Sequence, residues 1–524
     1  MASQLRFLAS LAVVALLMPG AAVFAHAQEE EHGRLVLVQP IENLSGQTAL
    51  DWIGEAVPEI INPRLASAGF LTISRTDRLY ALDHLGLPLN FRPSRATTLR
   101  IAQTLDANYV LTGSYALVNG RLTVTLQILD VQNLHLGKPL VTEEASEKLL
   151  DILNSSAWKV ARELDPKLSI AEETFLAANA NLRLDAFENY VRGLSEPSAE
   201  ERLKHLKLAT QLGPGYTPAW LALGKAYYAS EQFELAATTF ARIPKGDPAE
   251  LEALFYRGLS QFNAGIYARA EESFTAVAKV LPLPEVVNNQ GVAASRHGRD
   301  GSPQFLQAIQ SDPNDADYHY NLAVSLKRHG DAAGSAREVT AGLNLRPSDT
   351  GLQQLSEALN SHGAINDDPL ERIKRSYNEA GYRQAALQLE EVQEMRLANL
   401  PAKDRSAEET KSGDEYLNRG LMLEAEREYQ LAAAADSTNP LAQSGLAAIR
   451  ERSGDTQAAR KLAQQSLLIA PNAPAYLVLA RVEQGEGNLD AAAHDVANAL
   501  QLDKTNPAAL GMRQALEARG QHLP

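Results

Sequence analysis

The sequence of 524 residues contains no cysteine. This absence excludes disulfide bonds, thiolate metal sites, a cysteine nucleophile and a lipidated cysteine anchor, so the fold must be stabilised by packing alone. Positive charge is also scarce, because 49 Lys and Arg stand against 64 Asp and Glu and give a formal net charge of −15. An acidic chain argues against a nucleic-acid partner. The content of 45% hydrophobic and 22% charged residues is typical of a folded chain.

Long apolar runs are missing after the first 27 residues. An apolar run at residues 7–18 is followed by small residues that end in an Ala-x-Ala site, which predicts a secretory signal peptide at residues 1–27. An uncleaved membrane anchor is the alternative, but Pro19 and Gly20 interrupt the apolar run. No later stretch approaches the roughly 20 apolar residues of a membrane span. We therefore expect an exported bacterial protein, periplasmic or envelope-associated, with no transmembrane span in its mature chain.

A chain of this length exceeds one compact core, so several modules are expected. Residues 34–165 are predicted to form a small α/β domain that begins with a buried strand at residues 35–38. Its clearest signal is the pair of segments Tyr109–Val118 and Arg121–Val131. The dipeptide Asn119-Gly120 joins them and favours a type I′ turn, so a β-hairpin is predicted.

Four helices are predicted around these strands, at residues 49–68, 76–85, 94–105 and 146–164. Thr76 and Ser94 are placed to cap the second and third helices. Pro58 and Pro63 lie inside the first. They are expected to kink or split it, because proline lacks the N–H that a helix requires.

Two segments of this domain carry a family resemblance. Residues 40–46 (PIENLSG) and 52–55 (WIGE), followed by residues 106–115 (DANYVLTGSY), resemble the amino-terminal domain of the bacterial translocation protein TolB. Related domains of curli-secretion and flagellar outer-membrane proteins are similar. The resemblance covers about residues 35–165 and implies an envelope-associated assembly role without catalysis. The two prolines depart from the usual unbroken helix of that family.

The rest of the chain is periodic. Residues of four types recur 34 positions apart, in the pairs Gly224 and Gly258, Ala236 and Ala270, Phe240 and Phe274, and Pro248 and Pro282. Glycine and alanine let paired helices approach closely, the aromatic ring fills the space beneath the turn, and proline ends the second helix. This pattern resembles the tetratricopeptide repeat over about residues 183–503. The resemblance implies an all-α superhelical solenoid that follows the α/β domain, and a binding role for it.

Polar stretches divide the predicted solenoid into a front and a rear array. The front array covers residues 183–347, and a polar joint follows at residues 348–368. The rear array covers residues 369–519, with a degenerate first unit around Tyr377 and a terminal capping helix.

Solenoids of this family bind peptides or partner helices in the concave groove lined by the first helix of each hairpin. The candidate groove residues, spaced like the inward face of those helices, are Lys225, Tyr228, Phe255, Phe262, Asn263, Tyr320, Lys327 and Arg328. Taken singly, each aromatic residue is better explained as inter-repeat core and each charge as a solvated surface group, so the prediction concerns the groove as a whole. The set of Lys and Asn by which some relatives hold a peptide carboxylate is not found, so a C-terminal carboxylate ligand is unsupported.

Catalytic and metal motifs are not found. G-x-S-x-G, H-E-x-x-H and the P-loop pattern are absent. Ser156 and Lys159 match S-x-x-K, but that short pattern arises often by chance and its companion motif is missing. The histidines, including His319 and His329, are scattered singly. We expect no enzyme, no cofactor and no metal site.

These observations favour an exported scaffold in which an α/β docking module binds an envelope component and a solenoid recruits a protein or peptide. A structural subunit that self-associates within an envelope assembly is the alternative from another class. An enzyme assembled across the α/β module is the weakest hypothesis.

Overall fold

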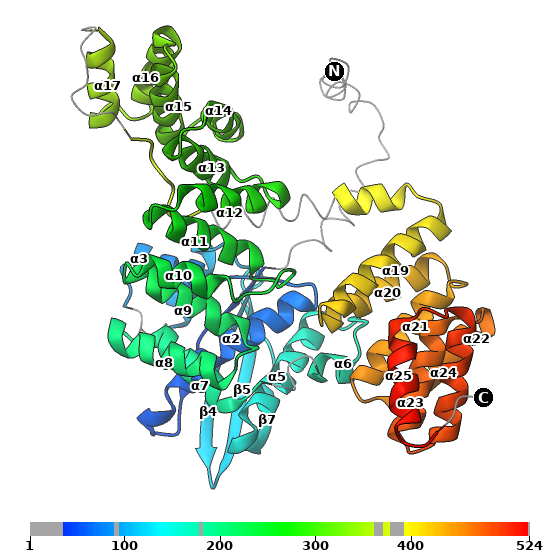
Figure 1. The fold of residues 1–524 in the computed structure, drawn as a ribbon. Helices are drawn as coiled ribbons and strands as arrows, with labels where there is room; N and C mark the ends of the chain where they lie inside the picture. The colour runs from blue at the N-terminus through cyan, green and yellow to red at the C-terminus, as the bar shows by residue number, and fades with distance from the viewer. Residues whose placement is uncertain (1–34, 89–93, 178–181, 361–369, 378–391, 522–524) are drawn as a thin grey trace, which may run out of the picture. The chain divides into compact units, whose positions relative to one another are not determined.

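The computed structural model describes residues 35–88, 94–177, 182–360, 370–377 and 392–521 (Figure 1). The predicted signal peptide lies outside these ranges. The chain divides into two compact units, Met1–Ser169 and Ile170–Pro524. The first is a small α/β domain and the second consists of helical hairpins, which confirms the predicted fold class.

The first unit is built on a mixed sheet of seven strands with the order β3-β1-β4-β5-β6, while β2 pairs with β4 and β7 pairs with β5. The strands are β1 (Leu35–Val38), β2 (Glu42–Asn43), β3 (Leu71–Thr72), β4 (Tyr109–Val118), β5 (Arg121–Asp130), β6 (His135–Leu136) and β7 (Leu140–Ala145). β4 and β5 form the predicted hairpin, with Val118 opposite Arg121. Asn119 and Gly120 have φ of 51° and 76°, as a type I′ turn requires.

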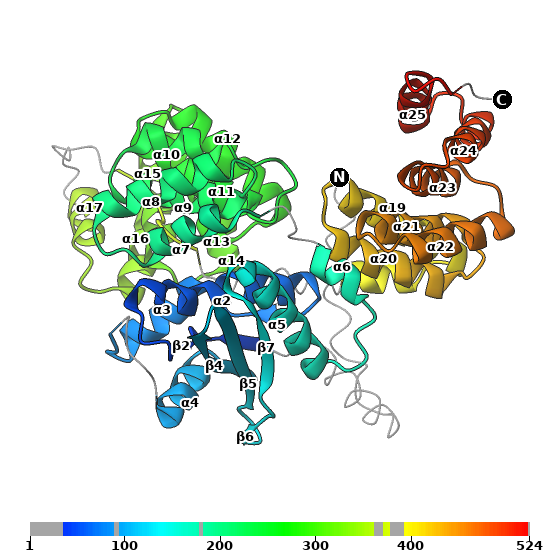
Figure 2. The ribbon, with the colours of Figure 1, turned by 90° about the horizontal axis from the view of Figure 1, so that it is seen from below.

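Helices cover this sheet. They are α2 (Trp52–Ser67), α3 (Arg75–His84), α4 (Arg95–Thr104) and α5 (Leu149–Leu164). α2 and α5 pack on each other and on the strands, while α3 and α4 share a separate core with Leu37 and Val110 (Figure 2). Ser94 caps α4 as predicted. α3 begins two residues earlier than predicted, because Ser74 accepts the hydrogen bond from the Asp77 backbone N–H at 3.0 Å.

Of the predicted kink or split of the first helix, the split is wrong. α2 is one helix of 16 residues with Pro58 and Pro63 inside it. Each proline costs about 3 kcal/mol in a helix interior. Val57, Ile61 and other aliphatic side chains of α2 are completely buried, and each contributes about 1.5 to 3 kcal/mol. Tertiary burial therefore outweighs the local cost.

The second unit begins with α6 (Glu172–Ala177) and continues as stacked antiparallel hairpins (Figure 1). The front array consists of α7 (Leu184–Ser195), α8 (Ala199–Leu212), α9 (Thr217–Ala229), α10 (Phe233–Phe240), α11 (Glu250–Asn263), α12 (Tyr267–Val280), α13 (Pro284–Arg296), α14 (Ser302–Ser311), α15 (Ala316–Arg328) and α16 (Ala332–Leu345). α17 (Thr350–Asn360) packs on α16, within the stretch predicted as a polar joint.

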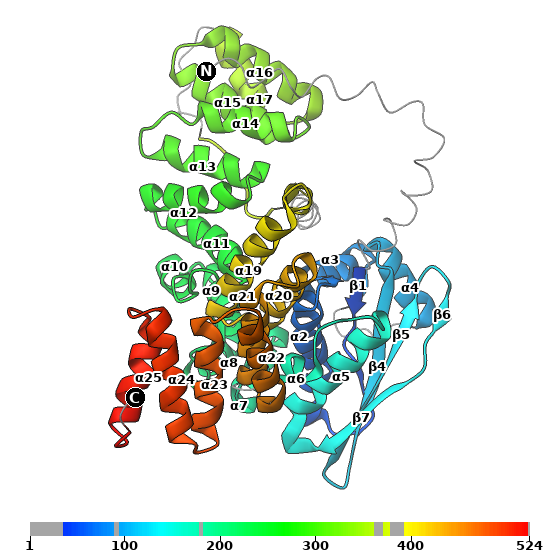
Figure 3. The same cartoon turned by 90° about the vertical axis from the view of Figure 1, so that its right-hand side faces the viewer.

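The rear array follows the same plan (Figure 3). It consists of α19 (Ala402–Asn418), α20 (Met422–Ala435), α21 (Pro440–Arg452), α22 (Thr456–Ile469), α23 (Ala473–Gly485), α24 (Leu489–Leu502) and α25 (Pro507–Glu517). Gly420, Gly454 and Gly487 have φ of 80°, 87° and 86° and form the turns inside its hairpins. Residues 378–391, which carry most of the predicted degenerate unit, lie outside the described ranges.

The repeated glycines and aromatic residues pack against each other within each hairpin, whereas Pro248 lies beyond the end of α10 at Phe240 and does not end that helix as predicted. The Phe240 ring is 2% exposed, and a Cβ placed on Gly224 would lie 2.5 Å from it. One repeat later, Phe274 is fully buried and a Cβ on Gly258 would lie 2.7 Å from its ring. Because Cβ contacts below 3.0 Å are essentially not seen, only glycine permits the aromatic ring to fill each hairpin.

Candidate functional site

The front array holds a piece of its own chain in its groove. Residues 370–377 (LERIKRSY), called the groove segment below, form neither helix nor strand. Their partners lie on α15, α13 and α11, the first helices of three successive hairpins, and the segment passes these helices in that order (Figure 1). The segment therefore follows the axis of the array, opposite to the order of the repeats.

Two asparagines recognise the main chain of the groove segment. The Asn321 side chain on α15 accepts a hydrogen bond from the Arg372 N–H at 2.7 Å and donates one to the Arg372 carbonyl at 2.8 Å. Asn289 on α13 does the same for Lys374, with both distances 2.7 Å. Residues two apart in an extended chain face the same side. The two asparagine amides therefore hydrogen-bond the main chain of the segment as a neighbouring β-strand would. These contacts do not depend on the side chains of the segment.

A third asparagine supports this pair. Asn288 accepts a hydrogen bond from the Asn321 amide at 2.7 Å and donates one to the Arg372 carbonyl at 3.1 Å. All three asparagine residues are completely buried. Buried amides are costly unless they are hydrogen-bonded, so the segment satisfies groups that the array places in its groove.

Acidic side chains bind two of the three basic residues of the groove segment, Arg372 and Lys374. The Arg372 guanidinium donates to both carboxylate oxygens of Asp349 at 2.7 Å, to Asp317 at 2.8 Å, and lies 3.8 Å from the centre of the Tyr320 ring. Lys374 Nζ lies 2.6 Å from Asp315 and 2.7 Å from Asp317. Forked arginine and carboxylate pairs are among the strongest polar contacts in proteins.

Basic and apolar side chains of the array contact Glu371, Ile373 and Tyr377 of the segment. The completely buried Glu371 carboxylate pairs with Arg328 and lies 3.6 Å from Arg296, which also donates to the Glu371 carbonyl at 3.0 Å. Ile373 packs against the hydrophobic cores of these hairpins. The Tyr377 ring meets the Phe255 ring edge to face, with the centroids 5.0 Å apart. The groove therefore distinguishes an acidic, a basic, an aliphatic and an aromatic position.

Ion pairing sets the charge state of the groove. Burial alone would raise the pKa of Asp317, but hydrogen bonds from Lys374 and Arg372 lower it to about 2. The hydrogen bond from Arg372 likewise lowers the pKa of Asp349. Arg346 faces both carboxylates, at 2.9 Å from Asp317 and 3.2 Å from Asp349, and adds to the effect.

Acid release of the segment is expected only well below neutral pH. A lowered carboxyl pKa stabilises the docked state fully above the ordinary aspartate pKa of about 3.9, and the stabilisation is lost as pH falls through the bound value, about 2 for Asp317. Hydrogen exchange at the Arg372 and Lys374 amides, corrected for intrinsic rates, should show equal protection at pH 7 and 5 and a loss below pH 3. Helical amides of α15 serve as the control for unfolding. Loss of protection between pH 7 and 5 would contradict this assignment.

The predicted groove residues fall into two groups. Phe255, Tyr320 and Arg328 contact the groove segment directly, and Phe262 borders the same cores as Ile373. Phe255 and Tyr320 are buried, 1% and 6% exposed, so they line an occupied groove and not an open one.

Of the other predicted residues, Tyr228 also borders the core that Ile373 and Tyr377 meet, and it interacts electrostatically with Arg375 of the segment. Its hydroxyl accepts a hydrogen bond from the Asn263 amide at 3.4 Å. Lys225 pairs with Glu252 and lies 5.0 Å from the centre of the Tyr256 ring. Lys327 is half-buried, and the described residues show no contact between it and the segment.

Sequence reasoning missed the residues with the most contacts to the segment. These are Asn288, Asn289, Asn321, Arg296, Asp315, Asp317 and Asp349, together with the groove segment itself. A signal was present, because Asn288 and Asn321 stand 33 positions apart and occupy equivalent places in successive repeats. The search for a carboxylate clamp that requires lysine passed over them.

The weak catalytic candidates have structural partners. Ser156 donates to the Ile152 carbonyl at 2.7 Å within α5, and Lys159 donates to Thr142 at 3.1 Å. His319 Nδ1 lies 2.7 Å from Glu338, and His329 Nδ1 lies 2.8 Å from the Ser325 carbonyl. Among the described residues, no group of three or more His, Asp or Glu could hold a metal ion.

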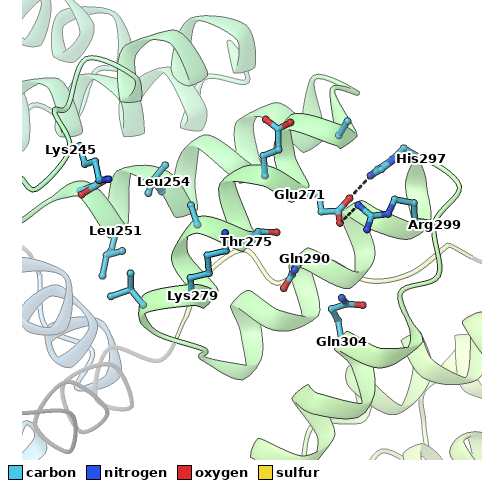
Figure 4. Close-up of a pocket in the computed structure, with 15 residues that line it drawn as sticks. Lys245, Leu251, Leu254, Glu271, Thr275, Lys279, Gln290, His297, Arg299 and Gln304 are labelled. Carbon is cyan, nitrogen blue, oxygen red and sulfur yellow. Dashed lines mark hydrogen bonds and ion pairs between the residues drawn. The ribbon is translucent and has the colours of Figure 1, made fainter. Parts of the chain in front are cut away.

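A second hollow, of about 790 Å³, lies on α11 to α14 of the front array (Figure 4). Figure 4 shows Glu271 flanked by His297 and Arg299, whose nearest nitrogens lie 2.5 Å and 2.7 Å from its carboxylate. None of the residues that bind the groove segment line this hollow. Because its central charges satisfy one another, the groove is the stronger candidate site.

Comparison with known proteins agrees with this architecture. Residues 221–280 match the family model of the tetratricopeptide repeat. The helical unit has the long run of paired helices that is typical of a tetratricopeptide-repeat solenoid, as predicted, and this fold supports a role as a protein–protein interaction scaffold. No curated protein matches the sequence.

Several solved structures show similarity to parts of the chain. MamA from Desulfovibrio magneticus RS-1, residue 41 to its end, is 22% identical, with 32% of this chain and 99% of MamA covered and a TM-score of 0.30. YrrB, a TPR protein with an unusual peptide-binding site, is 16% identical over 38% of this chain and 98% of its own, with a TM-score of 0.30. TolB from Acinetobacter baumannii is 16% identical over 26% and 29% of the two chains, with a TM-score of 0.19. The TolB-like character of the first unit stays a prediction.

Within the described ranges, no helix is both long and apolar enough to cross a bilayer.

Proposed function

We propose that this protein is an exported scaffold whose front groove binds an extended segment of a partner protein, while the α/β unit docks on an envelope component. The observation that carries the proposal is the pair of asparagines that hydrogen-bond the main chain of residues 372 and 374 at both N–H and C=O. Such contacts recognise an extended chain as an added strand does, through its backbone.

The charges around the asparagines support a peptide ligand. Arg296 and Arg328 lie beside Glu371, and Asp315, Asp317 and Asp349 lie beside positions 372 and 374 of the bound chain. A groove with ordered charges of both signs fixes the direction and register of its ligand. Export and envelope docking rest on the predicted signal peptide and on the TolB-like resemblance of residues 35–165.

Capture of partner proteins tests the groove. The mature chain, a double variant Asn289→Ala with Asn321→Ala, and a control variant Asn488→Ala are each used as bait in envelope extracts. The double variant removes four main-chain hydrogen bonds of about 1 kcal/mol each, so proteins bound in the groove should be reduced by about tenfold or more. Asn488 is exposed in the rear array and its amide contacts only Glu483 and Glu486, so its replacement should leave capture unchanged.

Quantitative mass spectrometry of the captured proteins gives the result, after circular dichroism shows that all three baits are helical. An identical set of proteins on all three baits would place the binding surface elsewhere on the molecule. A bait that captures only copies of itself would favour the self-associating subunit.

A further inference from the structure

We infer that the groove segment is an internal ligand of the front groove, and that the partner which uses this groove presents an extended segment of the same chemistry. That chemistry is an acidic residue, then a basic, an aliphatic and a basic residue in succession, and an aromatic residue three positions later. The inference rests on the proposed function, and it adds the kind of ligand and the means by which access to the groove is controlled.

The order of the charges determines which chain fits. Glu371 lies between Arg296 and Arg328, and the next residue, Arg372, lies between Asp317 and Asp349. A peptide in which these two charges are exchanged would put a carboxylate against carboxylates, and such like-charge contacts weaken binding at an interface. The groove therefore selects by charge order as well as by main-chain contact.

Two apolar positions add to the selection. Ile373 and Tyr377 meet the cores of the inner helices, and Tyr377 faces Phe255. Aliphatic and aromatic anchors between charged residues are typical of groove-bound peptides, because they fix the register of the bound chain.

The array does not need the groove segment for its own core. The clusters that hold α11 to α16 together consist of side chains from those helices and from α17, with Phe274, Phe305 and Leu352 fully buried among them. Ile373 and Tyr377 add to these cores only at their margins. Most of the segment's own contacts are hydrogen bonds and ion pairs, which water or another peptide can replace. A segment held in this way can leave without unfolding the hairpins.

A tethered ligand competes strongly with a free one. A segment attached to the same chain acts at an effective concentration of about millimolar. If the segment binds its groove with a dissociation constant of about 10 to 100 μM, a free peptide of the same chemistry appears 10- to 100-fold weaker than its intrinsic affinity. Removing the internal ligand should return the affinity of the groove for a free peptide to its intrinsic value.

The test uses a fluorescent, end-capped peptide with the sequence of residues 370–377 and the full mature protein. Arg372→Glu with Lys374→Glu should expel the internal ligand, because both new carboxylates face Asp315, Asp317 and Asp349. The matched control, Lys245→Glu with Lys279→Glu, makes the same change in net charge at two exposed lysines that line the hollow in Figure 4.

Fluorescence anisotropy should show that the Arg372 and Lys374 variant binds the peptide 10- to 100-fold more tightly than the wild type, while the control equals the wild type. Adding Asn289→Ala and Asn321→Ala to the tighter variant should remove binding, and a peptide with Glu371 and Arg372 exchanged should bind at least tenfold more weakly.

Three results would overturn the inference. Equal peptide affinity in wild type and variant would mean that the segment does not compete for the groove, and capture of envelope proteins would then decide the proposed function by itself. No binding to a variant that remains helical would refute the ligand chemistry, while capture of envelope proteins would decide the proposed function separately. If the wild type has the mass of two chains in solution and the variant has the mass of one chain, the segment binds a second copy of the protein.

Discussion

Replacing Phe240 with alanine is expected to lower the free energy of unfolding of the solenoid by about 3 to 5 kcal/mol. The ring is 2% exposed, stacks on Tyr256 at 5.9 Å between centroids, and fills the space that Gly224 leaves open. Its removal leaves a cavity in one hairpin and at the junction with the next. Urea denaturation followed by circular dichroism at 222 nm measures the change.

The same helix provides the control. Leu235 also lies on α10, but 49% of its surface is exposed, so Leu235→Ala should change stability by no more than about 0.5 kcal/mol. Similar destabilisation by both variants would mean that α10 is packed through another face, and that the 34-residue register of the repeats is misassigned.

Replacing Arg450 with alanine is expected to destabilise the rear array by about 3 to 5 kcal/mol, because it leaves a buried carboxylate without its counter-charge. Glu426 is completely buried and lies 2.6 Å from Arg450, which is 13% exposed. The same arginine donates to Thr174 on α6 at 2.6 Å, and Glu426 accepts a hydrogen bond from the Ala171 N–H at 3.2 Å. Loss of the arginine should therefore also release α6.

Limited proteolysis near residues 171–177 and urea denaturation measure the two effects together. Arg513→Ala is the control, because its pair with Glu517 is separated by 3.7 Å and both side chains are more than 40% exposed, so at most about 1 kcal/mol is expected. If the Arg450 variant is as stable as the Arg513 control, water reaches the Glu426 carboxylate and the assignment of a buried ion pair is wrong.

Local patterns predicted the parts of the fold that depend on local physics. The dipeptide Asn119-Gly120 specified its hairpin through two residues of positive φ, and the spacing of Gly224 and Phe240 specified how paired helices approach. The effect of Pro58 and Pro63 on helix α2 could not be predicted in this way. Their cost is local, whereas the burial that offsets it comes from strands and helices far along the chain.

The candidate site was predicted in outline only. Helical spacing pointed to the inward face of the front array and to Phe255, Tyr320 and Arg328, but it treated the groove as open. The partners of Asn288 and Asn289 lie 84 and 85 positions away, beyond the reach of any repeat pattern. Residues 370–374 were assigned to the rear array because their composition says nothing about the groove that receives them.

The docking of α6 has a consequence for how the chain reaches its folded state. Repeat arrays have low contact order, since each hairpin meets only its neighbours and folding can spread along the chain. Here the residues around α6 bind partners 255 and 276 positions further on, and closing a loop of that length costs about 5 kcal/mol of chain entropy. We therefore expect the last step of folding to be slow and non-local. In this step α6, at the beginning of the helical unit, docks on α20 and α21 after these two helices have folded.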